Sequence, residues 1–114
     1  MRILFVEDHR VFAEAVVAQF LSAHEVEIAE SVAIARKAIV TGPAFDAVLV
    51  DYDLPDGKGT EVVRQLRADR FKGSIIAVSA KDEGNAELRA AGAHAICKKA
   101  ELRQLAITLS QLSR

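Results

Sequence analysis

The fold class is decided by the stretch Ala47-Val48-Leu49-Val50-Asp51-Tyr52-Asp53-Leu54-Pro55-Asp56-Gly57-Lys58-Gly59. Its first four residues are all apolar, which is typical of a strand covered on both faces of a parallel sheet. A carboxylate, Asp51, follows the strand directly. The clustered proline and glycines at 54–59 then predict a loop. The stretch therefore predicts a buried strand that ends in an acidic side chain at the edge of a sheet.

The same pattern repeats on both sides of this stretch. Apolar runs predict further strands at 3–6, 26–29 and 75–78, and a weak one at 95–97. Helical spacing and capping signals predict helices at 11–23, 31–40, 60–68 and 82–91, and a last helix with the apolar stripe Leu102, Leu105, Leu109 and Leu112. Strands that alternate with helices predict one α/β domain over residues 1–114, in which helices cover both faces of a five-stranded parallel sheet.

Composition excludes several classes of protein. A hydrophobic fraction of 51% with 27% charged residues argues against disorder. The net charge of −1 provides no basic field for nucleic acid or for an anionic membrane. Charges interrupt every apolar stretch before the roughly 18 residues that a membrane span requires. The single cysteine, Cys97, cannot form an internal disulfide, so we expect a cytoplasmic protein. From the net charge and the interrupted apolar stretches, we expect no nucleic-acid and no membrane partners.

Polar residues follow the predicted strands at the edge where ligands bind in open α/β sheets. They are Glu7 and Asp8 after the first strand, Asp51 after the third, Ser79 after the fourth, and Lys98 and Lys99 after the fifth. Two carboxylates about 4 Å apart repel by about 4 kcal/mol at an effective dielectric near 20. One lysine cannot offset three such acids. Because the ligands are hard oxygens, the cluster predicts a site for Mg²⁺, with Mn²⁺ as an alternative.

Asp51 is the predicted nucleophile of this cluster. A carboxylate can accept a phosphoryl group and form an acyl phosphate. The transferring group needs positive charge and hydrogen-bond donors around it. A cation on Glu7 and Asp8, the Lys99 ammonium and the Ser79 hydroxyl would supply them.

At these residues the chain resembles the receiver domain of two-component response regulators, over essentially its whole length. The matching elements are Val6-Glu7-Asp8, the stretch from Val50-Asp51 to Gly59, Val78-Ser79-Ala80, and Gly92-Ala93 followed by Lys99. The resemblance implies a flavodoxin-like, doubly wound fold with strand order 2-1-3-4-5. It also implies Mg²⁺-dependent phosphotransfer to Asp51 from a phosphohistidine of a sensor kinase or phosphotransfer protein, which switches contacts with a downstream protein.

The resemblance assigns further roles residue by residue. Asp51 is the phosphoacceptor, and the metal would bind Glu7, Asp8, Asp51 and the backbone carbonyl of Asp53. Ser79 matches the switch hydroxyl, and Lys99, rather than Lys98, matches the invariant lysine. Asp53 and Lys81 match positions that tune dephosphorylation, and they could form a salt bridge across the route of the attacking water. Such a domain catalyses only its own phosphorylation and dephosphorylation, so we do not expect an enzyme with an external substrate.

Three departures from the family lie near the face through which receivers usually signal. Ile96 stands where the family has a tyrosine or phenylalanine, and Ala100 stands where a proline often follows the lysine. The segment from Ser79 to Gly92 is shorter than usual, which predicts a short fourth helix. We therefore expect the phosphorylation chemistry to be kept and the output surface, including the switch position Ile96, to be unusual.

Other interpretations remain open at the level of the sequence. Asp51-Tyr52-Asp53 resembles the D-x-D motif of haloacid-dehalogenase-like phosphatases, although the acidic pair comes first here. A pseudo-receiver that binds partners without accepting phosphate is the second alternative. His9 adjoins the acidic pair and is expected to be a surface residue. The last helix is expected to face the core, and part of it could pair with a second copy in a homodimer.

Overall fold

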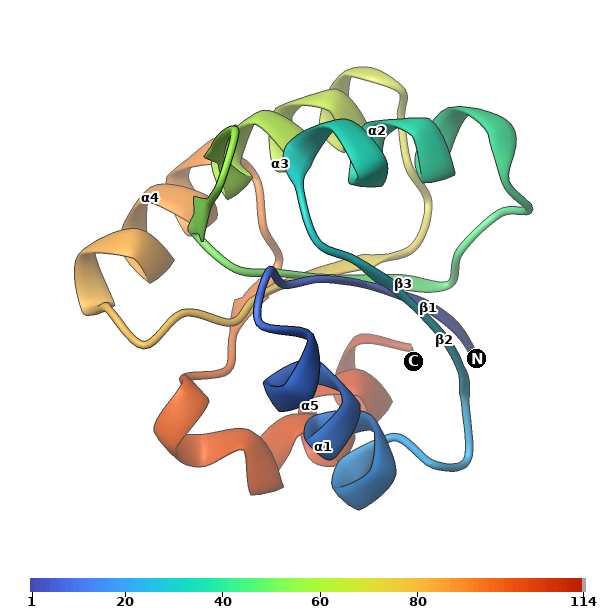
Figure 1. Cartoon of the computed structure of the whole chain (residues 1–114), viewed down its shortest axis with the longest axis vertical. Helices are drawn as coiled ribbons and strands as arrows, with labels where there is room; N and C mark the ends of the chain where they lie inside the picture. The colour runs from blue at the N-terminus through green and yellow to red at the C-terminus, as the bar shows by residue number, and fades with distance from the viewer. Residues whose placement is uncertain (114) are drawn as a thin grey trace.

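The computed structural model describes residues 1–113, which form a three-layer α/β fold (Figure 1). One parallel sheet of five strands lies in the middle, in the order β2-β1-β3-β6-β7. Its strands are β1 (Arg2–Val6), β2 (Glu25–Ala29), β3 (Ala47–Val50), β6 (Ser74–Ala77) and β7 (Ala95–Ile96). The expected flavodoxin-like topology is therefore confirmed, because this order is 2-1-3-4-5 when the strands of the sheet alone are counted.

Helices cover both faces of the sheet, as Figure 1 shows. On one face lie α2 (Val32–Thr41), α3 (Gly59–Ala68) and α4 (Asp82–Ala91). On the other lie α1 (Arg10–Phe20), the 3₁₀ helix η1 (Lys99–Gln104) and α5 (Leu105–Leu112). The helix predicted at 82–91 has these bounds, and it is as long as α2 and α3.

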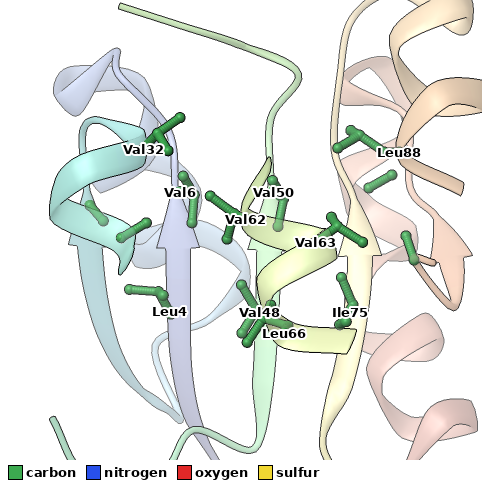
Figure 2. Close-up of a cluster of buried hydrophobic side chains, with 14 of the residues drawn as sticks. Leu4, Val6, Val32, Val48, Val50, Val62, Val63, Leu66, Ile75 and Leu88 are labelled. Atoms are coloured by element: carbon green, nitrogen blue, oxygen red, sulfur yellow. The ribbon is translucent and has the colours of Figure 1, made fainter. Parts of the chain in front are cut away.

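The core consists of two apolar layers, because successive side chains of a strand point to opposite faces. Leu4 and Val48 pack with α2 and α3 on one face, where Figure 2 shows Val48 beside Leu66 and Leu4 on the neighbouring strand. Ile3 and Leu49 pack with α1 and α5 on the other face. All four strand residues are fully buried. Central strands that are apolar throughout are thus explained by helices on both sides.

Two of the predicted helices differ from the structure, one in its end and one in its continuity. Helix α1 ends at Phe20 instead of residue 23, because the buried Leu21 leaves helical geometry and its carbonyl accepts the backbone N–H of His24 at 3.0 Å in a turn toward β2. The last helix is broken into η1 and α5, because Glu101 has a non-helical backbone (φ −124°, ψ 30°). The stripe Leu102, Leu105 and Leu109 is buried in the core, as expected.

The segment predicted as a loop at 54–59 is more regular than expected. It contains a two-stranded antiparallel ribbon, β4 (Asp53–Leu54) and β5 (Gly57–Lys58), and it leads directly into α3. At the tip of the ribbon, the Asp56 carboxylate accepts the backbone N–H groups of Ala33 and Val32, at 2.9 and 2.8 Å. These two hydrogen bonds hold the pKa of Asp56 below its usual range. The ribbon is therefore fastened to the N-terminus of α2, beside the cap that Ser31 supplies.

The topology brings several strand ends to one edge of the molecule. The strand order reverses direction between β1 and β3, which is where a crevice forms in folds of this kind. The carboxyl ends of β1, β3, β6 and β7 all reach that edge, because the four strands are parallel.

Within residues 1–113, no helix has the length and apolar character needed to cross a membrane.

Candidate functional site

Backbone hydrogen bonds hold the strand exits in register at the carboxyl edge of the sheet. The amide of Asp51 donates to Val6 O at 3.0 Å, so the residue after β3 lies beside the end of β1. The amide of Val78 donates to Val50 O at 2.8 Å, which places the exit of β6 beside the exit of β3. The amide of Lys99 lies 3.4 Å from Ser79 O. The side chains that follow the strands therefore converge because the sheet continues beyond its regular ends.

Lys99 lies between two buried carboxylates. Its Nζ is 2.7 Å from Glu7 Oε1 and 3.1 Å from Asp51 Oδ2. The side chain of Glu7 is completely buried, and that of Asp51 is 9% exposed. The Lys99 ammonium also lies over the ring of Phe12, 4.8 Å from its centroid. The predicted convergence of Glu7, Asp51 and Lys99 is therefore observed.

Burial and mutual charge shift the pKa values of this group. Burial raises the pKa of Glu7, and the negative charge of Asp51 adds to the rise, while Lys99 opposes it. Burial lowers the pKa of Lys99, but hydrogen bonds to Glu7 and Asp51 outweigh this effect and raise it overall. The site therefore holds a firmly protonated lysine next to a carboxylate that is costly to ionise.

The acidic pair offers oxygens that suit a cation. Glu7 Oε1 is a buried oxygen whose one close donor is the Lys99 ammonium, and Asp8 Oδ1 is a buried oxygen that accepts no hydrogen bond within residues 1–113. A hard divalent cation such as Mg²⁺ binds carboxylate oxygens of this kind. Glu7 and Asp8 therefore fit the expected metal. Their ligand atoms and that of His9 lie within 4.8 Å of one another, and this cluster does not include Asp51.

His9 is closer to the acidic pair than the sequence suggested. Its side chain is 73% exposed, as expected of a surface residue, yet its Nδ1 lies 3.3 Å from Glu7 Oε2 and 3.2 Å from Asp8 Oδ1. Its backbone N–H also donates to Glu7 Oε2 at 3.1 Å. Adjacency in sequence was the only signal for this contact. Lys98, in contrast, turns away and pairs with Asp82 at 3.3 Å.

Two side chains of the site, those of Asp51 and Ser79, accept hydrogen bonds from nearby backbone N–H groups. The Asp51 carboxylate accepts the backbone N–H of Tyr52 through Oδ1 at 2.8 Å, which fixes its orientation. Ser79 is buried, and its Oγ accepts the backbone N–H of Lys81 at 3.1 Å. The hydroxyl hydrogen of Ser79 is therefore left to donate to another group.

The carboxylate of Asp53 binds two lysines, Lys58 and Lys81. Lys58, across the β4–β5 ribbon, pairs with one of its oxygens, and Lys81 lies 3.2 Å from the other. These two partners, Lys58 first, hold the pKa of Asp53 below its usual range. The salt bridge between Asp53 and Lys81 is thus present, and it connects the segment after β3 with the segment after β6.

Two residues near the site, Ile96 on β7 and Asn85 on α4, differ in their exposure to solvent. Ile96, on β7, is 40% exposed and adds no aromatic ring near the site. Asn85, on α4, is buried, and its side chain binds the backbone of Ser79. Sequence reasoning missed Asn85, because nothing in the spacing of residues relates it to a strand end.

Comparisons with known proteins agree with this geometry. The family model described as "Response regulator receiver domain" matches residues 3–109. The response regulator TrrA from Thermotoga maritima, solved in complex with Mg²⁺ and BeF, is 25% identical with a TM-score of 0.86, and the match covers 97% of each chain. A CheY-like receiver domain protein from Methanospirillum hungatei is also 25% identical, with a TM-score of 0.79, and the match covers 98% of this chain and 95% of that one. Comparison with curated proteins found no match.

Proposed function

Because the chain belongs to the response regulator receiver domain family of two-component systems, we propose that it is a phosphoacceptor domain in which Asp51 receives the phosphoryl group. A partner protein, a sensor histidine kinase or a phosphotransfer protein, supplies the group from a phosphohistidine. The modified domain then changes its contacts with a downstream protein. One observation carries this proposal: a single ammonium, that of Lys99, contacts both the buried Glu7 and the candidate acceptor Asp51.

The transfer needs little from the protein beyond placement and charge. An oxygen of Asp51 attacks phosphorus, the bond from phosphorus to the imidazole nitrogen breaks, and its electron pair stays on the imidazole. The N–H of Tyr52 keeps the Asp51 carboxylate oriented for this attack. Lys99, which contacts Asp51, and the Ser79 hydroxyl are the groups that we propose stabilise charge on the phosphoryl oxygens.

A divalent cation at the acidic pair would neutralise part of the phosphoryl charge. Glu7, Asp8 and Asp51 supply carboxylate oxygens for it, and the backbone carbonyl of Asp53 is the fourth ligand that we propose. The buried Asp8 Oδ1, which accepts no hydrogen bond within residues 1–113, supports this assignment. So does the related TrrA, whose title names a complex with Mg²⁺ and BeF. Mg²⁺ is the proposed ion, and Mn²⁺ would bind the same oxygens.

Mass spectrometry after incubation with acetyl phosphate and Mg²⁺ tests the chemistry. We expect the parent chain to gain about 80 Da, the mass of a phosphoryl group, and to gain nothing when EDTA is added. Asp51→Asn should gain nothing, whereas the control Asp82→Asn, which removes an exposed carboxylate paired with Lys98, should still be labelled. Labelling of Asp51→Asn would overturn the assignment of the acceptor.

Two other outcomes would favour the rival functions. An unlabelled parent that still binds Mg²⁺ would indicate a pseudo-receiver that only binds partners. Continuous hydrolysis of a phosphomonoester at ordinary enzyme rates would indicate a phosphatase of the haloacid-dehalogenase type. A receiver shows neither, because it turns over only its own phosphoryl group.

We also propose that Asp53 and Lys81 set the lifetime of the phosphoryl group. Their salt bridge connects the two segments that flank the site, the one after β3 and the one after β6. The positions that match this pair in receivers flank the route of the attacking water, and we propose that the salt bridge obstructs that route here. The pair therefore slows dephosphorylation, and the additional contact of Lys58 with Asp53 helps to hold it in place.

A further inference from the structure

Asn85 makes two buried hydrogen bonds, and both go to the backbone of Ser79. The Ser79 N–H donates to Asn85 Oδ1 at 2.9 Å, and Asn85 Nδ2 donates to the Ser79 carbonyl at 3.0 Å. Asn85 is 2% exposed and Ser79 is 3% exposed. Strand β6 has already ended at Ala77, so the side-chain amide takes the place of a neighbouring peptide group. The exit of β6 is thereby clamped to the second turn of α4.

The clamp holds the backbone of Ser79 and leaves its hydroxyl free. Ser79 Oγ accepts only the N–H of Lys81 within the described residues, so its hydrogen can still be donated. A buried donor and a buried acceptor left without partners are costly. A displacement of Ser79 therefore carries α4 with it, because the alternative is to break both hydrogen bonds inside the protein.

The adjacent residue of α4 contacts the other side of the site. A Cβ atom at Gly84 would lie 2.8 Å from Tyr52 Cβ, so the backbone of the helix rests directly on the residue that follows Asp51. Helix α4 is therefore in contact with the residue after the acceptor through Gly84 and with the hydroxyl residue through Asn85. The helix is placed to respond to a change at either position.

We propose that Asn85 is a positioning residue that fixes the Ser79 hydroxyl at the site and transmits its displacement to helix α4. The inference rests on the proposed function, since the displacement arises when Ser79 donates to a phosphoryl oxygen on Asp51. It gives this chain a connection from the site to its surface that does not depend on residue 96, where the exposed Ile96 offers no ring to move.

NMR of the ¹⁵N-labelled chain with BeF₃⁻ and Mg²⁺ as the phosphoryl mimic tests the inference. In the parent, the amides of Asp51, Tyr52 and Ser79 and those of residues 82–91 should shift together. Asn85→Asp keeps the shape and the acceptor for the Ser79 N–H but removes the donor to the Ser79 carbonyl. In that variant the shifts at Asp51 and Tyr52 should remain, and those along α4 should be lost.

Two further variants separate positioning from a structural effect. Ala86→Asp adds the same charge at the neighbouring exposed position, and its α4 shifts should match those of the parent. Ser79→Ala keeps both backbone hydrogen bonds with Asn85, so it should fold, but it removes the hydroxyl. It should lose the α4 shifts as Asn85→Asp does, and combining the two changes should cause no further loss.

The outcomes distinguish this inference from the proposed function. A parent whose Asp51 and Tyr52 amides do not respond to BeF₃⁻ and Mg²⁺ contradicts the proposed function. A parent that responds there while α4 stays unchanged overturns the inference alone. So does an Asn85→Asp or a Ser79→Ala variant in which the α4 shifts persist. Ser79→Ala keeps both hydrogen bonds between Asn85 and the Ser79 backbone. If the Asn85 variants do not fold, α4 shifts that persist in Ser79→Ala would still contradict the inference.

Discussion

Replacing Lys99 with methionine should destabilise the protein far more than a surface lysine substitution would. Methionine keeps an unbranched chain of similar length and removes only the ammonium. The two carboxylates that it contacts would stay in place, with Glu7 completely buried and Asp51 nearly so. Both would then lack their only lysine partner among the described residues. The cost comes from leaving buried negative charges uncompensated.

The distances in the site give the size of this effect. The ion pairs of Lys99, at 2.7 and 3.1 Å, contribute roughly 6 and 5 kcal/mol of Coulomb attraction at an effective dielectric near 20. The contacting oxygens of Glu7 and Asp51 are at most 5.8 Å apart, the sum of those two distances. Their repulsion at that separation is about 3 kcal/mol. Desolvation offsets much of the attraction, so the net loss should be about 3–5 kcal/mol, as for other buried pairs that lose one partner.

Urea denaturation in EDTA measures this loss as a change in the free energy of unfolding. Lys98→Met is the matched control, because its pair with Asp82 is exposed and should contribute under about 1 kcal/mol. Adding Mg²⁺ should stabilise Lys99→Met, since the ion supplies the missing positive charge. Lowering the pH should also reduce the loss, because Glu7, whose pKa burial already raises, then takes up a proton.

Equal losses in the free energy of unfolding for Lys99→Met and Lys98→Met in EDTA would contradict this prediction. They would mean that Glu7 and Asp51 are solvated or separated in solution, so that their negative charges do not crowd each other. A large cost that neither Mg²⁺ nor low pH reduces would point to lost packing against Phe12 instead.

Three other substitutions probe the surroundings of the site. Asp56→Ala should lower the melting temperature at pH 7, because it removes the carboxylate from the N-terminus of α2. The pKa of Asp56 is lowered in the folded state. The difference in melting temperature between parent and variant should therefore persist above about pH 4 and vanish as the pH falls through that lowered pKa. Gly59→Ala should cost about 1–3 kcal/mol in urea denaturation, because its Cβ would lie 1.9 Å from the Asp51 carbonyl, and a neutral result would show that the loop yields easily. Lys81→Met should shorten the half-life of the labelled protein, followed by mass spectrometry, whereas an unchanged half-life in this variant and at high salt would exclude a role for the Asp53 pair.

The strands could be predicted because short apolar runs have few other interpretations. The run at 75–78 overlaps β6, and the run at 47–50 coincides with β3. Their order in the sheet came only from the family resemblance, since no local pattern specifies which strands pair. The bounds of α1 and the break at Glu101 depend on where buried side chains meet the sheet, and a spacing argument contains no such information.

Some residues of the site could likewise be predicted from the sequence, and others could not. Glu7, Asp51 and Lys99 were predicted because each follows a strand, and parallel strands deliver such residues to one edge. Asn85 could not be predicted, because its role depends on how α4 lies against the exit of β6. The contact of His9 with Asp8 likewise depends on side-chain orientation beyond the reach of a sequence pattern.

The ion-paired cluster at Lys99 joins regions that are synthesised far apart in time. Glu7 and Asp51 leave the ribosome before their counterion, which arrives only with the segment that begins the 3₁₀ helix η1. A nascent chain that stops short of that segment lacks the ammonium that pairs with both carboxylates. We therefore expect the cluster to become stable only after that segment has been synthesised, whatever the order in which the strands form.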